Sequence, residues 1–219
     1  MAKHGARKIT NRGRRDRVIG QFMSVKMKKA VWWESQLERD YCYILEHDQD
    51  VIAYRSQPIT ISYSFEDKIL KHTPDFEIIR RGLDLPQYVE IKPDEKAMKD
   101  EFIRLHQARS AFFHARGCEY LLRTGSQIRE GHRLNNIKLL YRYAQTPLDP
   151  LVVAGLHHNV PTHSELSMEE LIAQCADYGA DRSVCYALMY QGQIVFDLDK
   201  PIRPDMSVKA AWSAQEESS

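Results

Sequence analysis

The segment from residue 51 to residue 91 alternates short β-branched and aromatic runs with turn-forming prolines and glycines. Runs of this length and composition, bounded by such residues, are typical of β-strands. The four runs are Val51–Tyr54, Ile59–Phe65, Asp75–Ile79 and Tyr88–Ile91, and the residues between them include Pro58, Pro74, Gly82 and Pro86. We therefore expect these four runs to be strands of one sheet.

Helical patterns flank this β-rich segment. Before it, the S-x-x-E sequence Ser35–Glu38 is a capping box, and it predicts a helix that runs to about Glu46. After it, apolar residues recur every three or four positions from Asp94 to Arg116, which predicts one amphipathic helix ending at Gly117. A further strand is expected at Glu119–Arg123. This order predicts a small α/β domain over residues 31–126, with a mixed, partly antiparallel sheet closed by a crossover helix.

A second, smaller unit is expected over residues 127–204. Helices are predicted at Asn135–Ala144, from the capping box at Ser167 to about Ala176, and at Asp181–Ala187. Met189-Tyr190 and Gln193–Leu198 are then expected to form a strand, turn, strand hairpin. Three helices followed by a hairpin predict a winged-helix-like C-terminal domain. Residues 205–219 are expected to be a flexible tail.

The composition favours an ordinary globular protein. Of 219 residues, 43% are apolar and 28% are charged, which excludes neither enzymes nor binding modules but argues against wholesale disorder. No apolar run approaches the roughly twenty residues that cross a bilayer, so we expect a cytoplasmic protein without a membrane partner. The cysteines form no C-x-x-C pair, which argues against a zinc ribbon and favours buried core positions for Cys42, Cys118, Cys175 and Cys185.

Positive charge is concentrated at the N-terminus. Residues 1–29 hold ten lysines and arginines against the single acid Asp16, although the whole chain has a net charge of only +1. We interpret residues 1–30 as a basic arm, which would give salt-sensitive, sequence-independent affinity for nucleic acid; a solvated tail explains the composition equally well. The candidate DNA-binding residues in this arm are Arg12, Arg14, Arg15, Arg17, Lys26, Lys28 and Lys29.

The strongest chemical signal combines Pro74-Asp75 with Glu90-Ile91-Lys92. Glu90 and Lys92 lie two residues apart in a predicted strand, so their side chains share a face, and a turn after Gly82 can bring Asp75 alongside. Two clustered carboxylates repel each other, and a divalent cation relieves that repulsion. Mg²⁺, with Mn²⁺ as substitute, prefers oxygen ligands such as Asp75, Glu90 and the carbonyl of Ile91. Lys92 would orient or deprotonate a water, or stabilise charge on a phosphate.

Each of these residues also has an ordinary structural interpretation. Asp75 is a common turn residue after proline, and Glu90 with Lys92 could be a solvated surface ion pair. Glu38 could supply an extra carboxylate to the metal or to a water, but as the third residue of its capping box it is favoured locally as a cap. His72 could contact a scissile phosphate, although a structural role is favoured. His157 and His158 are interpreted as loop residues.

Beyond the individual residues, positions 20–123 resemble the PD-(D/E)xK nuclease superfamily and, more narrowly, the TnsA endonucleases of heteromeric transposases. The resembling stretches are Ser24–Met27, Glu34–Asp40, Val51–Tyr54 with Gln57–Ile59, Thr73–Phe76 and Val89–Pro93. The resemblance places the family's catalytic acids on Glu38, Asp75 and Glu90, which would also hold the metal, and its lysine on Lys92.

The resemblance implies a Mg²⁺-dependent endonuclease that acts on double-stranded DNA. Such proteins cut the 5′ ends of a transposon, on the strands that are not joined to the target, while the DDE transposase TnsB cuts and joins the 3′ ends. The resemblance further implies contact with the AAA+ regulator TnsC through the C-terminal domain, and a bacterial cytoplasm with association to the nucleoid. Two alternatives stay open: a stand-alone restriction or repair nuclease, and a catalytically idle DNA-binding adaptor.

Overall fold

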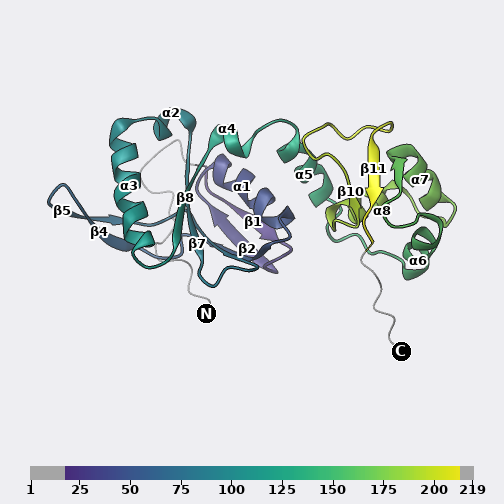
Figure 1. Ribbon diagram of the computed structural model, residues 1–219, viewed down its shortest axis with the longest axis horizontal. Coiled ribbons are helices and arrows are strands. Elements are labelled where there is room, and N and C mark those ends of the chain that lie inside the picture. Colours follow the sequence, from purple (N-terminus) through teal and green to yellow (C-terminus); the bar gives the residue numbers. More distant parts are fainter. Residues whose placement is uncertain (1–17, 213–219) are drawn as a thin grey trace. The chain divides into compact units, whose positions relative to one another are not determined.

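The computed structural model describes residues 18–212. The chain divides into two compact units, residues 1–130 and residues 131–219, which are called unit 1 and unit 2. Figure 1 shows the helices and strands of each unit. The observed boundary lies four residues after the one expected at residue 126, since the short helix α4 (Gly125–Ile128), which was not predicted, belongs to unit 1. Among the described residues, no helix is long and apolar enough to cross a membrane.

A four-stranded mixed sheet forms the centre of unit 1. Its order is β3 (Val51–Ser56), β6 (Phe76–Arg80), β7 (Gln87–Lys92) and β8 (Glu119–Thr124). The first three strands are antiparallel to their neighbours, whereas β7 and β8 are parallel. A parallel neighbour requires a crossover connection, and the helical segment between β7 and β8 supplies it. The predicted mixed α/β architecture is therefore confirmed.

Helices cover both faces of this sheet (Figure 1). On one face the ring of Tyr41, from α1 (Gln36–His47), lies 5.7 Å from the ring of Phe76, which is fully buried. On the other face Phe113, from α3 (Asp100–His114), stacks on Tyr88 and Tyr120 at 4.3 and 5.0 Å. Successive residues of a strand point to opposite faces, so the sequence of β7 supplies both layers.

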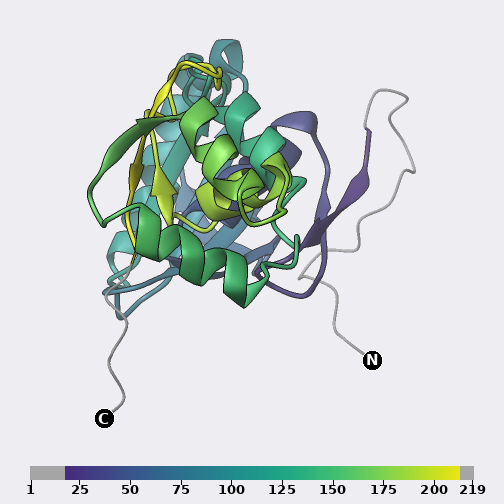
Figure 2. The same ribbon diagram turned by 90° about the vertical axis from the view of Figure 1, so that its right-hand side faces the viewer.

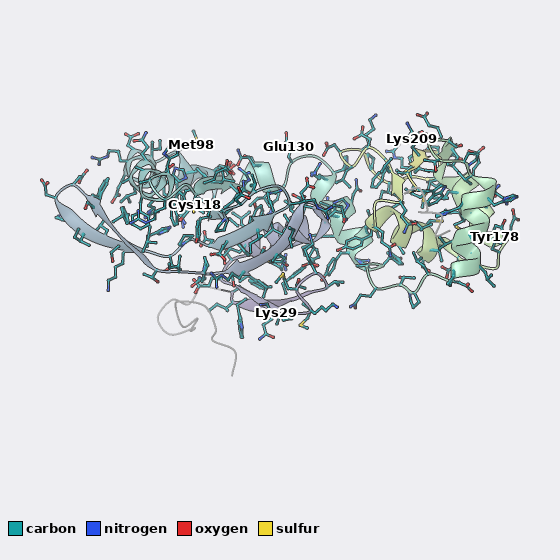
Figure 3. The ribbon with its side chains drawn as sticks, turned by 60° about the horizontal axis from the view of Figure 1, so that its bottom comes forward. Lys29, Met98, Cys118, Glu130, Tyr178 and Lys209 are labelled. Atoms are coloured by element: carbon teal, nitrogen blue, oxygen red, sulfur yellow. The ribbon has the colours of Figure 1, made fainter. Side chains whose placement is uncertain are left out.

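The crossover is broken into two helices, which corrects the expected single helix from Asp94 to Arg116. The short α2 (Asp94–Ala97) ends at Met98, and Lys99 is extended before α3 begins. Met98, labelled in Figure 3, is 76% exposed, although its spacing suggested a core position. The first turn of α3 carries two acids, which favour a helix start at that point because they complement the helix dipole. Helix α3 ends at His114, two residues before the expected end at Arg116, and Gly117 follows in the loop with a φ of +75°.

A hairpin of β1 (Gly20–Ser24) and β2 (Lys29–Trp33) packs on α1, so residues 20–30 of the expected basic arm belong to this hairpin. Glu46 of α1 anchors it. The buried carboxylate of Glu46 accepts bonds from the backbone N–H groups of Val25 and Lys26 at 3.1 and 3.0 Å, and from the hydroxyls of Ser24 and Tyr54. Figure 3 labels Lys29 at the start of β2.

The strand expected at Ile59–Phe65 does not join the central sheet. It becomes β4 (Ile61–Phe65), which pairs only with β5 (Lys68–His72) in a separate hairpin. The backbone turns away after β3, where Gln57 has a φ of +47° and Pro58 follows. The tight turn between β4 and β5 places both Glu66 and Asp67 at positive φ. Asn or Gly usually signals that conformation, so β5 was not predicted.

Unit 2 packs four helices against a small sheet, and Figure 2 brings it to the front. The helices are α5 (Arg133–Tyr141), α6 (Pro150–Asn159), α7 (Met168–Ala176) and α8 (Arg182–Tyr190). The antiparallel sheet has the order β10 (Ile194–Val195), β11 (Ser207–Ala210), β9 (Glu165–Ser167). Fully buried side chains from every layer form its core, among them Leu156, Leu171, Leu188 and Ile194.

Several expectations for unit 2 are wrong. Helix α6 was not predicted, and His157 and His158 lie on it rather than in a loop. Met189 and Tyr190 end α8 instead of forming a strand. The partner of β10 is β11, inside the segment expected to be a flexible tail, and Val208 and Ala210 of this strand are buried in the core. The rest of that segment, from residue 213, lies outside the described residues.

Candidate active site

One cavity of unit 1, of about 1020 Å³, brings together the four residues that the sequence singles out. Glu38 comes from the first turn of α1, Asp75 precedes β6, and Glu90 and Lys92 end β7. The cavity is also lined by residues of the β4–β5 hairpin and of α3. The structure therefore brings Glu38, Asp75, Glu90 and Lys92 to the wall of one cavity.

Asp75 forms two hydrogen bonds with the backbone of β7. Its N–H donates to the carbonyl of Val89 at 2.9 Å, and its Oδ2 accepts the N–H of Ile91 at 2.7 Å. The residue keeps partial solvent exposure, but the packing around its carboxylate is dense. This desolvation, together with the negative charges of Glu90 and Glu38, raises the pKa of Asp75 well above its ordinary value. The ionised form of this carboxyl group is therefore destabilised, and a nearby cation would stabilise it.

Glu90 is the most heavily engaged acid of the cavity. Glu90 is only 2% exposed. Its Oε2 lies 2.7 Å from Nε2 of His72 and accepts a hydrogen bond from the hydroxyl of Tyr120 at 2.6 Å. Its Oε1 forms an ion pair with Lys92 and lies 3.7 Å from Arg109. Burial opposes ionisation, but the hydrogen bond from His72 and the charge of Lys92 hold the pKa of Glu90 below its ordinary value. Glu90 is thus an ionised group inside the protein.

Lys92 is held at the rim of the cavity, and its side chain is 28% exposed. Besides its ion pair with Glu90, its Nζ donates to the carbonyl of Ile91 at 3.3 Å and lies 5.7 Å from the Phe102 ring. Because its partner carboxylate is almost fully buried, the pair differs from the solvated surface salt bridge that was the simpler interpretation.

Glu38 is a capping residue of α1 and also lines the cavity. Its backbone N–H donates to Oγ of the N-cap Ser35 at 3.2 Å, and its carboxylate accepts Ser35 Oγ at 2.9 Å and the Glu34 N–H at 2.7 Å. The same residue is 8% exposed, lines the cavity, and adds to the repulsion at Asp75. Burial raises the pKa of Glu38. The capping contacts therefore hold a carboxylate at the cavity wall.

Substitution of Glu38 by glutamine separates the two roles. Glutamine is also a capping-box residue, so Glu38→Gln should change the free energy of unfolding by less than about 1 kcal/mol. If the carboxylate takes part in the reaction, DNA cleavage should fall by a factor of at least about 10². Urea unfolding beside a plasmid-nicking assay measures both. Full nicking activity in Glu38→Gln would leave Glu38 with the capping role alone.

The donor set of the cavity suits a hard divalent cation. Asp75, Glu90 and Glu38 offer carboxylate oxygens, and Ile91 offers a carbonyl, which are the ligand types that Mg²⁺ prefers. Within residues 18–212, however, no three acids, histidines or cysteines are already arranged around one point. The reason is visible in the contacts, since the oxygens of Glu38 face its cap and those of Glu90 face His72 and Lys92.

Sequence reasoning missed several residues of this site. Tyr120 and Arg109 both contact Glu90, but they lie far from it in the chain and belong to no local motif. Gln57 lines the cavity at 4% exposure, and its buried Oε1 has no hydrogen-bond partner among the described residues. The backbone N–H of Gln57 donates to the Asp75 carbonyl at 2.9 Å, and its φ of +47° is a strained conformation that composition does not indicate. His72, weighed as structural, is part of the site.

The predicted DNA-binding lysines have different surroundings. Nζ of Lys26 donates to the carbonyls of Leu45 and Asp48 at 2.8 and 2.6 Å, so this ammonium secures the β1–β2 hairpin to α1. The DNA contact assigned to Lys26 stays a prediction beside this structural role. Lys28 occupies the hairpin turn with a φ of +52°, and Lys29 is exposed. Arg12, Arg14, Arg15 and Arg17 lie outside the described residues.

A comparison with protein families agrees with this geometry. Residues 48–125 match the family described as TnsA-like endonuclease N terminal, a range that contains Asp75, Glu90 and Lys92 but begins after Glu38. No curated protein matches the chain. The resemblance to TnsA is thereby confirmed at the level of the family. Over residues 48–125 the chain is therefore similar to the N-terminal domain of TnsA-like endonucleases.

Proposed function

We propose that this protein is the metal-dependent DNA endonuclease subunit of a heteromeric cut-and-paste transposase, and that it cleaves the non-transferred strands at the 5′ ends of the transposon. The observation that carries the proposal is the convergence of Asp75, Glu90 and Lys92 in one cavity of a TnsA-like domain. An isolated ion pair on a strand would not need a second buried carboxylate beside it.

The residues have distinct proposed roles. Asp75, Glu90, Glu38 and the carbonyl of Ile91 would hold Mg²⁺, with Mn²⁺ as substitute, and the bound cation would neutralise the acids and stabilise charge on the phosphate. The ammonium of Lys92 faces the same cavity, where it can orient water and stabilise charge that builds on the phosphate oxygens. Arg109 lines the cavity beside Glu90 and provides a second cation for the phosphate.

The biological setting is proposed from the family match. We propose double-stranded transposon ends as the substrate, a TnsB-type DDE transposase that processes the 3′ ends, and a TnsC-type AAA+ regulator, in a bacterial cytoplasm. We further propose that unit 2 is winged-helix-like and serves partner or duplex contact. Supporting this, α6, β9, α7, α8, β10 and β11 follow one another as three helices with a three-stranded antiparallel sheet.

The two alternatives differ in what they require of the cavity. A catalytically idle adaptor has no need for three acids and a lysine around one cavity, so the observed convergence disfavours it. A stand-alone restriction or repair nuclease needs the same residues, and only the family match and the partners separate it from a transposase subunit.

The test is a strand-mapping assay with the co-encoded transposase. Duplexes that carry a transposon end are labelled on one strand or the other and incubated with the protein, the transposase and Mg²⁺. The proposal predicts nicks on the non-transferred strand at the 5′ end, absent in EDTA. Efficient sequence-specific cleavage of both strands by the chain alone would favour the stand-alone nuclease. No cleavage in any combination would contradict the proposal.

A further inference from the structure

The β4–β5 hairpin has an outward face that no described part of the chain covers, and it begins at the rim of the cavity. Figure 1 shows the hairpin projecting from the rest of unit 1 beside α3. Its register pairs Ser62 with Lys71 and Ser64 with Ile69. All four residues are exposed, and residues two apart along a strand share a face, so these pairs form one continuous surface.

The opposite face of the hairpin is firmly attached to the protein. Ile61 and Tyr63 are 5% and 4% exposed and pack with Phe113 and Tyr120. Nε of Arg109 donates to the Tyr63 hydroxyl at 3.1 Å. An exposed ion pair of 2.6 Å also joins Arg104 of α3 to Glu66 in the hairpin turn. The outward face is therefore presented on a supported hairpin rather than on a mobile loop.

The chemistry of the outward face is that of a phosphate-contacting surface. Thr60 and Thr73, whose hydroxyls are 2.7 Å apart, extend it to the cavity, and Lys71 also lines the cavity. The face thus offers hydroxyls and one ammonium. The cross-strand pairs of this face, Ser62 with Lys71 and Ser64 with Ile69, include no acid. Lys71 makes no ion pair or side-chain hydrogen bond with any residue between 18 and 212. Serine, threonine and lysine side chains are common donors to DNA phosphates.

We propose that the outward face of the β4–β5 hairpin, formed by Thr60, Ser62, Ser64, Ile69, Lys71 and Thr73, binds the DNA backbone next to the cleaved phosphate. The inference rests on the proposed function, because the phosphate that enters the cavity fixes where the flanking duplex runs. Continuity of the face with the cavity selects DNA as its occupant. Ile69, which is 69% exposed, lies farther along the same face and would meet the sugars or the groove.

Charge reversal at Lys71 tests the proposal by equilibrium binding. Anisotropy of a short fluorescent duplex is measured in EDTA over a range of salt concentrations. Lys71→Glu should weaken binding about tenfold at low salt and reduce the slope of log affinity against log salt by about 1, because a phosphate contact is lost. Arg81→Glu is the matched control. It makes the same charge change at an exposed residue that follows β6 at the end away from Asp75, and should bind as the wild type does.

A positional measurement complements the binding data. Ser64→Cys, made in a Cys118→Ser background because the other three cysteines are buried, is labelled with an iron chelate that produces hydroxyl radicals. Cuts should cluster on one side of the nick site, whereas Arg81→Cys carrying the same label should give no cluster there.

The outcomes distinguish this inference from the function on which it rests. If the wild type nicks DNA but Lys71→Glu binds with unchanged affinity and salt slope, the hairpin is not a DNA contact and this proposal fails alone. If Lys71→Glu binds DNA normally but no longer binds the purified transposase, the face is a protein contact. That result would also overturn this proposal. A wild type that neither binds nor nicks DNA would overturn both proposals.

Discussion

Replacing Asp75 with asparagine is expected to abolish strand cleavage and to stabilise the fold. The pKa of Asp75 is raised by burial and by the charges of Glu90 and Glu38, so its ionised form is costly in the absence of a cation. Asparagine keeps an oxygen that can accept the Ile91 N–H and removes the charge. We expect the nicking rate to fall by at least about 10³, because several kcal/mol of cation-dependent stabilisation is lost.

The stability gain should depend on pH in a defined direction. A carboxyl group whose folded pKa is raised binds more protons in the folded state, so wild-type stability falls as pH rises above the unfolded value of about 3.9. Asp75→Asn lacks this loss. In EDTA the free energy of unfolding of Asp75→Asn should therefore exceed that of the wild type by about 1 kcal/mol at neutral pH, or about 2–4 °C in melting temperature. The difference should vanish below the unfolded pKa of Asp75.

Thermal unfolding at neutral and acid pH, beside a nicking assay, measures both effects. Glu77→Gln is a suitable control, since Glu77 is a buried acid of β6 that pairs with Arg55 and does not line the cavity. It should retain nicking activity. Cleavage by Asp75→Asn at the wild-type rate would remove Asp75 from the active site, and a melting temperature that drops at neutral pH would contradict the electrostatic argument.

Replacing Lys92 with alanine should impair the chemical step far more than cation binding. The ammonium faces the cavity and is held by Glu90 and the Ile91 carbonyl, whereas the proposed metal ligands are oxygens. Loss of a preorganised cationic group costs about 10²–10³ in rate. Removing its positive charge also leaves the carboxylates free to bind a divalent ion, so affinity for Mn²⁺ should stay the same or increase.

Single-turnover nicking and calorimetric Mn²⁺ titration distinguish these effects. Lys96→Ala is the matched control, because Lys96 also lines the cavity but is exposed at its rim on α2. Lys96→Ala should keep the rate within a few-fold of the wild type. If Lys92→Ala lost Mn²⁺ binding and activity in parallel, Lys92 would be needed to shape the cation site instead of the reaction.

The parts of the fold that follow local rules were predictable from sequence. The capping box at Ser35 sets the start of α1, and the alternation along Tyr88–Lys92 places Glu90 and Lys92 on one face, as observed. Side-chain periodicity is fixed by backbone geometry, so it can be deduced before any tertiary contact is known. The approach of Asp75 to Glu90 could be deduced from this periodicity together with the loop that joins β6 to β7 as antiparallel neighbours.

The rest depends on contacts that link distant parts of the chain. Pairing of β11 with β9 joins residues about forty positions apart, and nothing in Ser207–Ala210 alone distinguishes a strand from a tail. Arg109 is one of two arginines on α3, and only the docking of the helix places it beside Glu90. The contacts of Lys26 could not be deduced either, because nothing in a basic segment indicates which ammonium group binds backbone carbonyls.

The most direct test of the central claim, that Asp75 and Glu90 share a divalent cation, is anomalous scattering from crystals of the protein soaked in MnCl₂. The account predicts a manganese peak about 2.1 Å from a carboxylate oxygen of each residue, with Lys92 displaced from Glu90, and no such peak in Asp75→Asn crystals. A cavity without manganese in crystals of protein that nicks DNA under the same Mn²⁺ concentration would contradict it.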